Sequence, residues 1–339
     1  MQRVKIAQIG VTHEHANGKM KTLRLLPEIF EIAGVVNDLE TAKTARFVHR
    51  LDPVFDNSTW LTEAGVLNMR GLQAVTVEVP NMELLPVAER CLERGLPMHL
   101  DKPPGDDLER FARFRRRCAE KNVPLQMGYM FRGNPAIRFA INAVKQGWLG
   151  DVFEVQAGMS HNYGGEPYNG YLAQLRGGIM FNLGCHLIDF VVAMLDEPVA
   201  VTPFLNATAD VAAATANNAV AILEYPRALV TLHACSKEVG GLPKRRLKIC
   251  GTNGTIEIVP IERFDGKPLL LQMTLKDVAG NFPAGDITLN FGVIRDRYET
   301  QLREFAALVL RKSENPYSVE HDCITQKVLL AASGILPLH

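Results

Sequence analysis

The sequence predicts an α/β Rossmann domain followed by an α+β domain with a large, mainly antiparallel, open-faced sheet. Up to Met127, short β-like runs alternate with helix-like segments, which is typical of βαβ units and a parallel sheet. After Met127, most β-like runs follow one another without helices between them, which is typical of antiparallel pairing. The length of 339 residues fits about two domains, which we expect at 1–127 and 128–339.

The elements of the first domain are expected to alternate in chain order. Gly95 stands where a glycine commonly ends a helix, and Asp106 and Asp107 place negative charge at the start of the next helix. The expected strands are 4–9, 32–36, 74–79, 98–100 and 123–127, and the expected helices are 16–26, 39–49, 84–94 and 106–120.

The second domain is expected to contain one long series of strands. Turn signals such as Gly240-Gly241 separate several of them. Helices are expected at 135–146 and 185–195, and two more near the end of the chain, at about 294–309 and 324–329. The expected strands are 152–158, 199–205, 219–225, 229–234, 247–249, 255–258 and 269–274.

Composition and charge exclude several classes of protein. Apolar residues make up 47% of the chain and charged residues 22%, so the chain is neither disordered nor fibrous. Lys plus Arg and Asp plus Glu each number 37, and this balance does not indicate a partner among nucleic acids or anionic membranes. The chain contains no apolar run of about 18 residues, so we expect no membrane span. The scattered cysteines favour a cytoplasmic protein with reduced thiols.

The turn after the first expected strand is a candidate site for a dinucleotide pyrophosphate. Rossmann proteins place glycines here, so that backbone N–H groups and a helix N-terminus face the phosphates. Gly10 fits this pattern, whereas Thr12 and His15 stand at its second and third glycine positions. Asn37 and Asp38 follow at about the 20 residues expected for the ribose-binding position, and the Asp38 carboxylate favours NAD over NADP. An α/β connection that binds no nucleotide is the alternative.

His13 and His15 in this turn have two candidate roles. The pattern H-x-H is a possible spacing for metal ligands. However, the HExxH motif is absent, and loop histidines beside phosphates explain the pair equally well. We therefore count both as cofactor-binding candidates and expect no metal.

Polar residues at the ends of two later strands are further candidates. Pro80 and Asn81 follow one strand, and Asp101 and Lys102 follow the next. Ligands of open α/β sheets bind at this carboxyl edge, so we expect these residues beside the cofactor. Lys102 can donate a hydrogen bond to a substrate hydroxyl or to the cofactor ribose. The alternative is an exposed loop lysine paired with Asp101.

A second group of candidates follows Gly177 and Gly178. If the chain from Asn182 to Asp189 is helical, Asn182, His186 and Asp189 share one face. Histidine suits proton transfer near neutral pH, so His186 is a candidate catalytic base. The alternative is a histidine that is only packed inside the protein.

Together, these motifs and their order resemble the Gfo/Idh/MocA family, which includes glucose–fructose oxidoreductase and inositol dehydrogenase. The resemblance spans nearly the whole chain and rests on the first strand and turn, Asp101-Lys102-Pro103, Gly128-Tyr129 and 177–189. It implies a Rossmann domain that binds NAD or NADP and a second domain that covers the substrate and often oligomerises. It also implies that Lys102 matches the lysine of the family's E-K-P motif, with Asp101 in place of glutamate. His186 would be the proton-relay histidine, and Asn182 stands where the family commonly has aspartate.

The leading hypothesis is an NAD(P)-dependent dehydrogenase that acts on a secondary CH–OH group of a sugar or polyol. In this hypothesis Lys102 and His186 meet at one hydroxyl: Lys102 stabilises the developing oxyanion and His186 removes the proton. Asn182 positions the substrate or His186. Two other hypotheses stay open, namely a nucleotide-bound sensor or regulatory protein and a glycosidase of the same fold that uses bound NAD.

Substrate-binding residues are expected in the segment 160–176, which is rich in aromatic and polar side chains. The candidates are Tyr163, Tyr168 and Arg176, together with Asp189, and an ordinary surface loop is the alternative. The expected partner is a small sugar or polyol, with no nucleic acid and no membrane. The family resemblance implies a homodimer or homotetramer formed through the C-terminal sheet.

Overall fold

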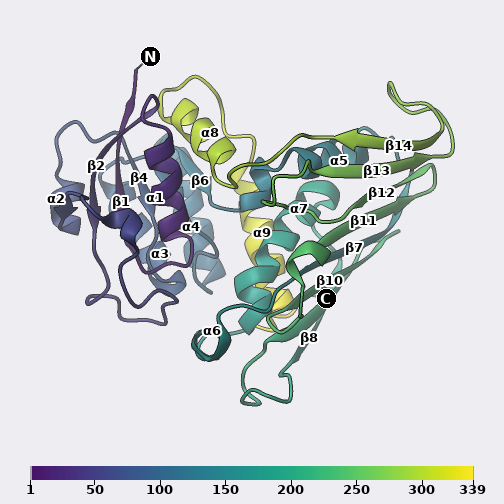
Figure 1. The fold of residues 1–339 in the computed structure, drawn as a ribbon, viewed down its shortest axis with the longest axis horizontal. Helices are drawn as coiled ribbons and strands as arrows, with labels where there is room; N and C mark the ends of the chain where they lie inside the picture. Colours follow the sequence, from purple (N-terminus) through teal and green to yellow (C-terminus); the bar gives the residue numbers. More distant parts are fainter. Residues whose placement is uncertain (1, 339) are drawn as a thin grey trace. The chain divides into compact units, whose positions relative to one another are not determined.

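The computed structural model describes residues 2–338, which form two compact units (Figure 1). The N-terminal unit comprises the chain up to Tyr129 together with Tyr298–Cys323. The C-terminal unit comprises Met130–Arg297 together with the chain from Ile324 onward.

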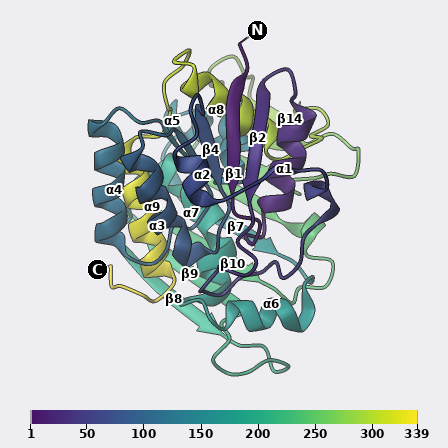
Figure 2. The ribbon, with the colours of Figure 1, turned by 90° about the vertical axis from the view of Figure 1, so that its left-hand side faces the viewer.

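The N-terminal unit contains a parallel sheet with strand order β3-β2-β1-β4-β5-β6 (Figures 1 and 2). The strand order reverses between β1 and β4, which is the point at which ligands bind in open α/β sheets. The predicted Rossmann architecture is therefore confirmed. The strands are β1 Val4–Ile9, β2 Phe30–Val36, β3 Trp60–Leu61, β4 Ala74–Val77, β5 Met98–Leu100 and β6 Leu125–Met127, and the helices are α1 Ala16–Leu25, α2 Glu63–Leu67, α3 Asn81–Glu93, α4 Leu108–Glu120 and α8 Glu299–Val309.

Helix α8 joins the N-terminal unit although it lies far along the chain. Leu302 and Phe305 from α8 pack with Val4 and Ile6 of β1 and with Phe30 of β2 in one buried apolar cluster. The N-terminal core therefore depends on a segment that is separated from it in sequence by most of the C-terminal unit.

The predicted helix at 39–49 is wrong, because the chain forms turns and bends there. The N–H groups of Lys43 and Thr44 donate to Oε1 of Glu83 on α3, at 2.7 and 2.9 Å. A side chain from another helix thus takes the place of the carbonyl groups that would accept these bonds within a helix. The short elements β3 and α2, which follow in this connection, were not predicted.

The C-terminal unit contains an eight-stranded sheet in the order β14-β13-β12-β11-β7-β10-β9-β8. Its neighbours are antiparallel except β7 and β10, which are parallel, so the predicted mainly antiparallel sheet is confirmed. The strands are β7 Val152–Ser160, β8 Ala200–Asn206, β9 Asn218–Glu224, β10 Leu229–Cys235, β11 Arg246–Gly251, β12 Gly254–Ile258, β13 Leu270–Leu275 and β14 Gly285–Asn290.

One face of this sheet is buried and the other is open. Burial alternates along β9 and β10, as expected for antiparallel strands with one covered face. Helix α7 (Cys185–Leu195) contacts β7, and the π-helical segment Met180–Gly184 contacts β9 and β10. The other helices are α5 Pro135–Lys145, α6 Gly165–Leu172 and α9 Val319–Ala332, the last of which begins in the N-terminal unit and ends in the C-terminal unit.

The segment before α7 differs from the regular helix that we expected. Met180–Gly184 is π-helical, so Asn182 does not have the α-helical relation to His186 that the spacing suggested. Gly178, which comes shortly before this segment, must be a glycine for a steric reason. At Gly178, with φ of +49°, a Cβ atom would lie 2.1 Å from the carbonyl oxygen of Ala216. A larger residue would therefore displace the start of this segment.

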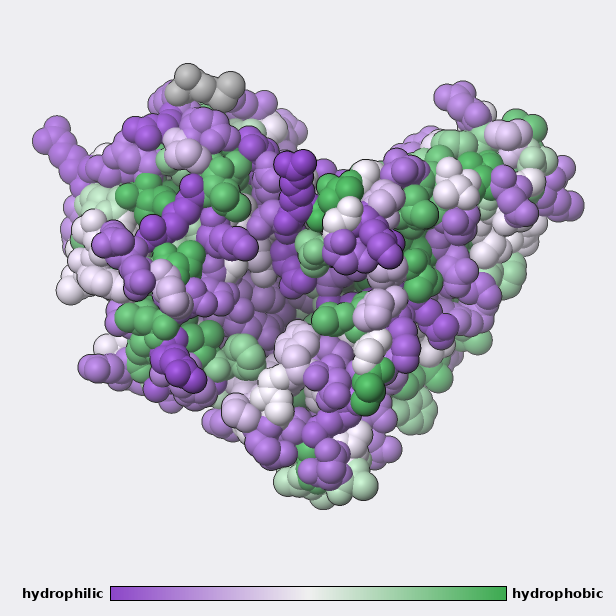
Figure 3. Space-filling view, in the orientation of Figure 1, coloured by the Kyte–Doolittle hydropathy of each residue, from purple (hydrophilic) through white to green (hydrophobic). Residues whose placement is uncertain are grey.

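Surface hydropathy is mixed on the face drawn in Figure 3, where hydrophobic residues form small groups between hydrophilic ones. Scattered apolar groups of this kind are normal on protein surfaces. Among the described residues, no helix is both long enough and apolar enough to cross a bilayer.

Candidate functional site

Predicted residues of the N-terminal unit come together at the carboxyl edge of its sheet. The turn after β1 begins at Gly10, with φ of +99°, where a Cβ atom would lie 2.5 Å from the carbonyl oxygen of Glu78. Only glycine fits this close approach between the β1–α1 turn and the end of β4. The turn is therefore built as a Rossmann turn at its first glycine position.

Asp38, after β2, is joined to the β1–α1 turn. Its Oδ1 accepts a hydrogen bond from the N–H of Val11 at 2.7 Å, and its Oδ2 accepts one from the hydroxyl of Thr12. Burial raises the pKa of this carboxyl, and the two hydrogen bonds oppose the shift. Asn37 is exposed, and its side chain accepts from the N–H of Leu39 at 3.0 Å. Of these two predicted ribose-binding residues, Asp38 is the one held at the turn.

His13 and His15 are buried and make defined hydrogen bonds. Nδ1 of His13 accepts from the N–H of His15 at 3.2 Å, so Nε2 carries the proton and donates to the carbonyl of Lys102, also at 3.2 Å. Nδ1 of His15 lies 3.0 Å from Oδ1 of Asp101. Burial lowers the pKa of His13 to about 4 and also lowers that of His15. Both imidazoles are therefore neutral near pH 7.

The same residues have the composition of a metal site. Ligand atoms of His13, His15 and Asp101 lie within 4.8 Å of one another. However, these atoms are engaged in the hydrogen bonds just described, and the Lys19 ammonium lies 3.2 Å from Asp101. A cation would have to replace these bonds and lie beside a positive charge. We therefore assign the three groups to hydrogen bonding.

Asp101 is the centre of a larger buried cluster. Its carboxylate accepts from the N–H of Lys102 at 2.7 Å and from Nζ of Lys19 at 3.2 Å. Burial alone would raise the pKa of Asp101, but Lys19 and the two histidines hold it well below its usual value. Burial and the neighbouring Asp101 instead raise the pKa of Glu78 well above its usual value.

Lys19 links this cluster to β5 and β6. Its Nζ also donates to Nε2 of His99, whose Nδ1 lies 2.9 Å from Oε1 of Gln126. Burial and the Lys19 charge lower the pKa of His99 to about 3, which agrees with a neutral ring that accepts from the ammonium. Lys19, Glu78 and His99 were missed in the sequence. A signal was present for His99, which stands between two apolar residues of the short buried strand β5, and for Lys19, which lies beside Met20 and Leu23 on the buried face of α1.

Lys102 follows strand β5, and its side chain is fully buried. Its Nζ donates to Oε1 of Glu14 at 3.0 Å, and its carbonyl accepts from Nδ2 of Asn81 at 3.0 Å. Pro80 is buried at the N-cap of α3, next to Asn81. Lys102 is thus not the exposed loop lysine paired with Asp101 that was the alternative, since the carboxylate beside its ammonium belongs to Glu14.

The predicted residues of the C-terminal unit have separate partners. The ring of His186 is buried and meets Phe131 edge-on, with ring centres 5.9 Å apart. Nδ2 of Asn182 donates to the hydroxyl of Tyr168 at 2.9 Å. The Asp189 carboxylate accepts from Nε and Nη2 of the Arg132 guanidinium, with the shortest distance at 2.6 Å. Arg132 was not among the predicted site residues. We predict that its pair with Asp189 stabilises the fold, and the substrate-binding role of Asp189 stays a prediction.

The predicted substrate segment is partly helical. Its middle part forms helix α6, Gly165–Leu172, rather than the ordinary surface loop that was the alternative. Tyr163 is 45% exposed and stacks on His161 with ring centres 3.6 Å apart, whereas Tyr168 is buried. The guanidinium of Arg176 lies 3.5 Å from the carbonyl of Ile335. Tyr163 is therefore the most accessible of the predicted substrate-binding tyrosines.

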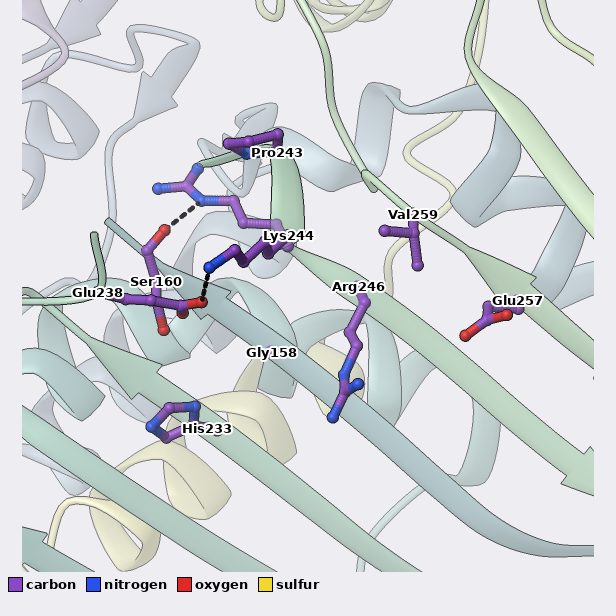
Figure 4. A pocket seen from close by; sticks show the side chains of 10 residues that line it. Gly158, Ser160, His233, Glu238, Pro243, Lys244, Arg246, Glu257 and Val259 are labelled. Carbon is purple, nitrogen blue, oxygen red and sulfur yellow. Dashed lines mark hydrogen bonds and ion pairs between the residues drawn. The ribbon is translucent and has the colours of Figure 1, made fainter. Parts of the chain in front are cut away.

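A cavity of about 480 Å³ lies on the sheet of the C-terminal unit (Figure 4). Strand register places His233, Gly158 and Arg246 in one row across β10, β7 and β11, and the missing side chain of Gly158 leaves the space between the other two. Glu238 pairs with Lys244 beside it, 3.8 Å apart. None of the predicted catalytic, cofactor-binding or substrate-binding residues lines this cavity.

The fold and the residues at the carboxyl edge define a two-unit protein with a Rossmann-type unit and an open-faced sheet unit. Residues 137–257 match the model of the GFO/IDH/MocA C-terminal domain. The expected resemblance to Gfo/Idh/MocA proteins is confirmed by this match and by the shared fold described next. No curated protein matches the chain in sequence.

Solved structures of low identity share the fold over nearly the whole chain. An oxidoreductase from Agrobacterium radiobacter, solved with NAD+, L-tartaric acid and magnesium, is 18% identical with a TM-score of 0.77, covering 98% of this chain and 96% of that one. GenD2 from gentamicin A biosynthesis, solved with NAD, is 17% identical with a TM-score of 0.77 and coverage of 100% and 97%. A protein described as a myo-inositol dehydrogenase, from Sinorhizobium meliloti, is 15% identical with a TM-score of 0.75 and coverage of 99% and 100%.

Proposed function

We propose that this protein is an oxidoreductase that uses NAD or NADP and acts on a secondary hydroxyl group of a sugar or polyol. The observation that carries this proposal is the place of the Lys102 ammonium, 3.0 Å from Glu14 of the β1–α1 turn at the carboxyl edge of a parallel sheet. Cofactor and substrate groups bind at this edge in open α/β folds. The similar structures solved with NAD support the choice of cofactor.

The residues at this edge fit a dinucleotide. Gly10 allows the backbone of the turn to approach closely. Helix α1 begins at Ala16, and its N-cap residue His15 makes no side-chain cap hydrogen bond, which favours a pyrophosphate at this N-terminus. Asp38 would bind the ribose hydroxyls, because the Val11 N–H and the Thr12 hydroxyl hold its carboxylate at the end of β2. We favour NAD, since a 2′-phosphate beside this carboxylate would be repelled.

The proposed chemistry assigns one task to each predicted catalytic residue. When bound, the nicotinamide supplies the hydride acceptor. Lys102 donates a hydrogen bond to the substrate oxygen and stabilises the negative charge that develops on it. His186 accepts the hydroxyl proton. Asn182, held by the Tyr168 hydroxyl, orients the substrate or His186.

A panel of sugars and polyols tests this proposal, with reduced nicotinamide measured by its absorbance and glycan cleavage measured in parallel. Net formation of NADH or NADPH with at least one polyol is the expected result. Glycan cleavage without net reduction would instead support an NAD-using glycosidase. Nucleotide binding without either reaction would support a sensor, which the departures from glycine at Thr12 and His15 and from aspartate at Asn182 favour.

We also propose a homodimer or homotetramer formed through the open face of the C-terminal sheet. Phe204 on β8 is 54% exposed and lies in register with Val220 of β9, so apolar side chains are adjacent on this sheet. Sedimentation velocity of the protein and its Phe204→Asp variant tests this. The proposal expects an oligomer that the substitution weakens, and a monomer in both samples would contradict it.

A further inference from the structure

Glu14 and Lys102 form a buried ion pair, and the proposed chemistry gives a task to the lysine but none to the glutamate. Oε1 of Glu14 lies 3.0 Å from Nζ of Lys102, with side-chain exposure of 11% for the glutamate and 0% for the lysine. We infer that Glu14 is a positioning residue for Lys102, which holds the ammonium at the place from which it meets the substrate oxygen. This inference rests on the function proposed above.

A buried ammonium needs a compensating negative charge, because transfer of an unpaired ion out of water is very unfavourable. The groups facing Lys102 from the β1–α1 turn are His13, Glu14 and His15, and Asp101 precedes it on the chain. Both histidines are neutral near pH 7, and Asp101 is engaged with Lys19 and His15. The Glu14 carboxylate therefore compensates the Lys102 charge.

The electrostatics of Glu14 agree with this task. Burial alone would raise the pKa of Glu14, but the Lys102 charge and the adjacent histidines lower it to about 2. Glu14 thus stays ionised over the whole range in which the protein is expected to work.

The location of Glu14 has a second consequence for the cofactor. Glu14 lies directly before the start of α1, where the helix dipole would otherwise favour phosphate oxygens. Its negative charge opposes a pyrophosphate at this place. Glu14 therefore keeps Lys102 in position and lowers the affinity for the dinucleotide, which separates its effect on turnover from its effect on binding.

The test compares Glu14→Gln, which removes the charge and keeps the shape, with Glu14→Asp, which keeps the charge. In cofactor-free protein, the titration of the Lys102 ammonium is followed by NMR of the protein with isotope-labelled lysine, since a fully buried side chain is out of reach of an added reagent. Loss of an opposite charge at this distance is expected to lower the titration midpoint by about 1 to 3 pH units in Glu14→Gln. The midpoint of Glu14→Asp, which keeps the charge on a shorter side chain, should fall by a smaller amount than that of Glu14→Gln.

Binding and turnover supply the second readout. Glu14→Gln is expected to bind NAD about 3- to 10-fold more tightly while kcat falls and its pH profile shifts, a split that simple misfolding would not produce. Glu89→Gln, which removes a carboxylate paired with Arg110 in the same unit, is the matched control and should change neither property.

The outcomes separate this inference from the proposed function. An unchanged titration midpoint of Lys102 and an unchanged kcat in Glu14→Gln would overturn the positioning role, even if the protein oxidises polyols. A shifted midpoint without hydride transfer to NAD or NADP from any substrate would keep the ion pair and overturn the proposed function. If Glu14→Gln does not fold, Glu14→Asp decides. Its shorter carboxylate lies farther from the ammonium, so the midpoint should fall by a smaller amount, and a midpoint equal to that of the unmodified protein would overturn the inference.

Discussion

Single residues at the carboxyl edge of the N-terminal sheet were partly predictable. The positions of Asp38, Asp101 and Lys102 follow from strand ends, since the carboxyl ends of parallel strands meet at one edge. The pairing of their charges cannot be derived from the strand ends in the same way. Glu14 and Lys102 are far apart in sequence, and no local pattern shows that the two side chains face each other.

At this scale we predict that Asp38→Ser lowers the affinity for NAD by about 10- to 100-fold, because hydrogen bonds to a charged acceptor are lost. The affinity for NADP should fall less, since the repulsion of a 2′-phosphate disappears as well. Titration calorimetry with both nucleotides measures this, with the exposed Asp56→Ser as control. Equal losses for NAD and NADP would contradict the ribose-binding role.

Secondary-structure elements were predicted where periodicity and caps agree. Helix α4 begins after Asp107, whose side chain accepts from the N–H of Arg110, and helix α7 has the bounds that the apolar run indicated. The predicted helix at 39–49 failed because the Glu83 side chain accepts from its backbone N–H groups, a long-range contact. The π-helical turn at Asn182 also depends on tertiary packing rather than on local propensity.

The ion pair between α7 and the 3₁₀ turn Met130–Gly133 gives a prediction at the scale of elements. Asp189→Asn leaves the Arg132 charge buried without its carboxylate, so the free energy of unfolding should fall by about 3–5 kcal/mol. Urea denaturation followed by circular dichroism measures it.

The exposed pair Glu109 and Arg113 provides the control for this measurement. Glu109→Gln should change the free energy of unfolding by no more than about 0.5 kcal/mol. If Asp189→Asn is as mild as this control, Asp189 is available for substrate and the structural assignment of the pair is wrong.

The molecule as a whole should lose stability in mild acid. His13 and His99 have pKa values of about 4 and 3 in the folded state and 6.5 when exposed, so unfolding takes up protons between these values. The free energy of unfolding therefore falls as pH drops from 6.5 toward 4, by about 1.4 kcal/mol per pH unit for each net proton taken up. The raised pKa of Glu78 has the opposite effect, because this carboxyl releases one proton on unfolding. The pKa of His15 is also lowered, so three histidines take up protons and the free energy of unfolding still falls in acid.

Melting temperatures between pH 7 and pH 4.5 check this dependence. The variant His99→Gln should show a shallower decline, because one of the protons taken up on unfolding is removed. A melting temperature that stays constant over this range in the unmodified protein would show that the histidines are not held neutral by burial.

At the scale of the whole chain, the two architectures were predictable from the sequence, but the assignment of one late segment was not. Strand–helix alternation and then successive strands predicted both architectures, because each pattern reports how sheet faces are covered. The return of Tyr298–Cys323 to the N-terminal unit was not predicted, since its helical periodicity shows an apolar face but not which core receives it.

The central claim is that Lys102 and His186 act on the same substrate in the same step. A double-mutant cycle with Lys102→Ala and His186→Asn, measured as kcat/KM for the best polyol, tests it most directly. The account predicts large losses for each single variant and little further loss in the double variant, as found for residues that act as a unit. Losses that multiply, or a single variant that retains full activity, would contradict it.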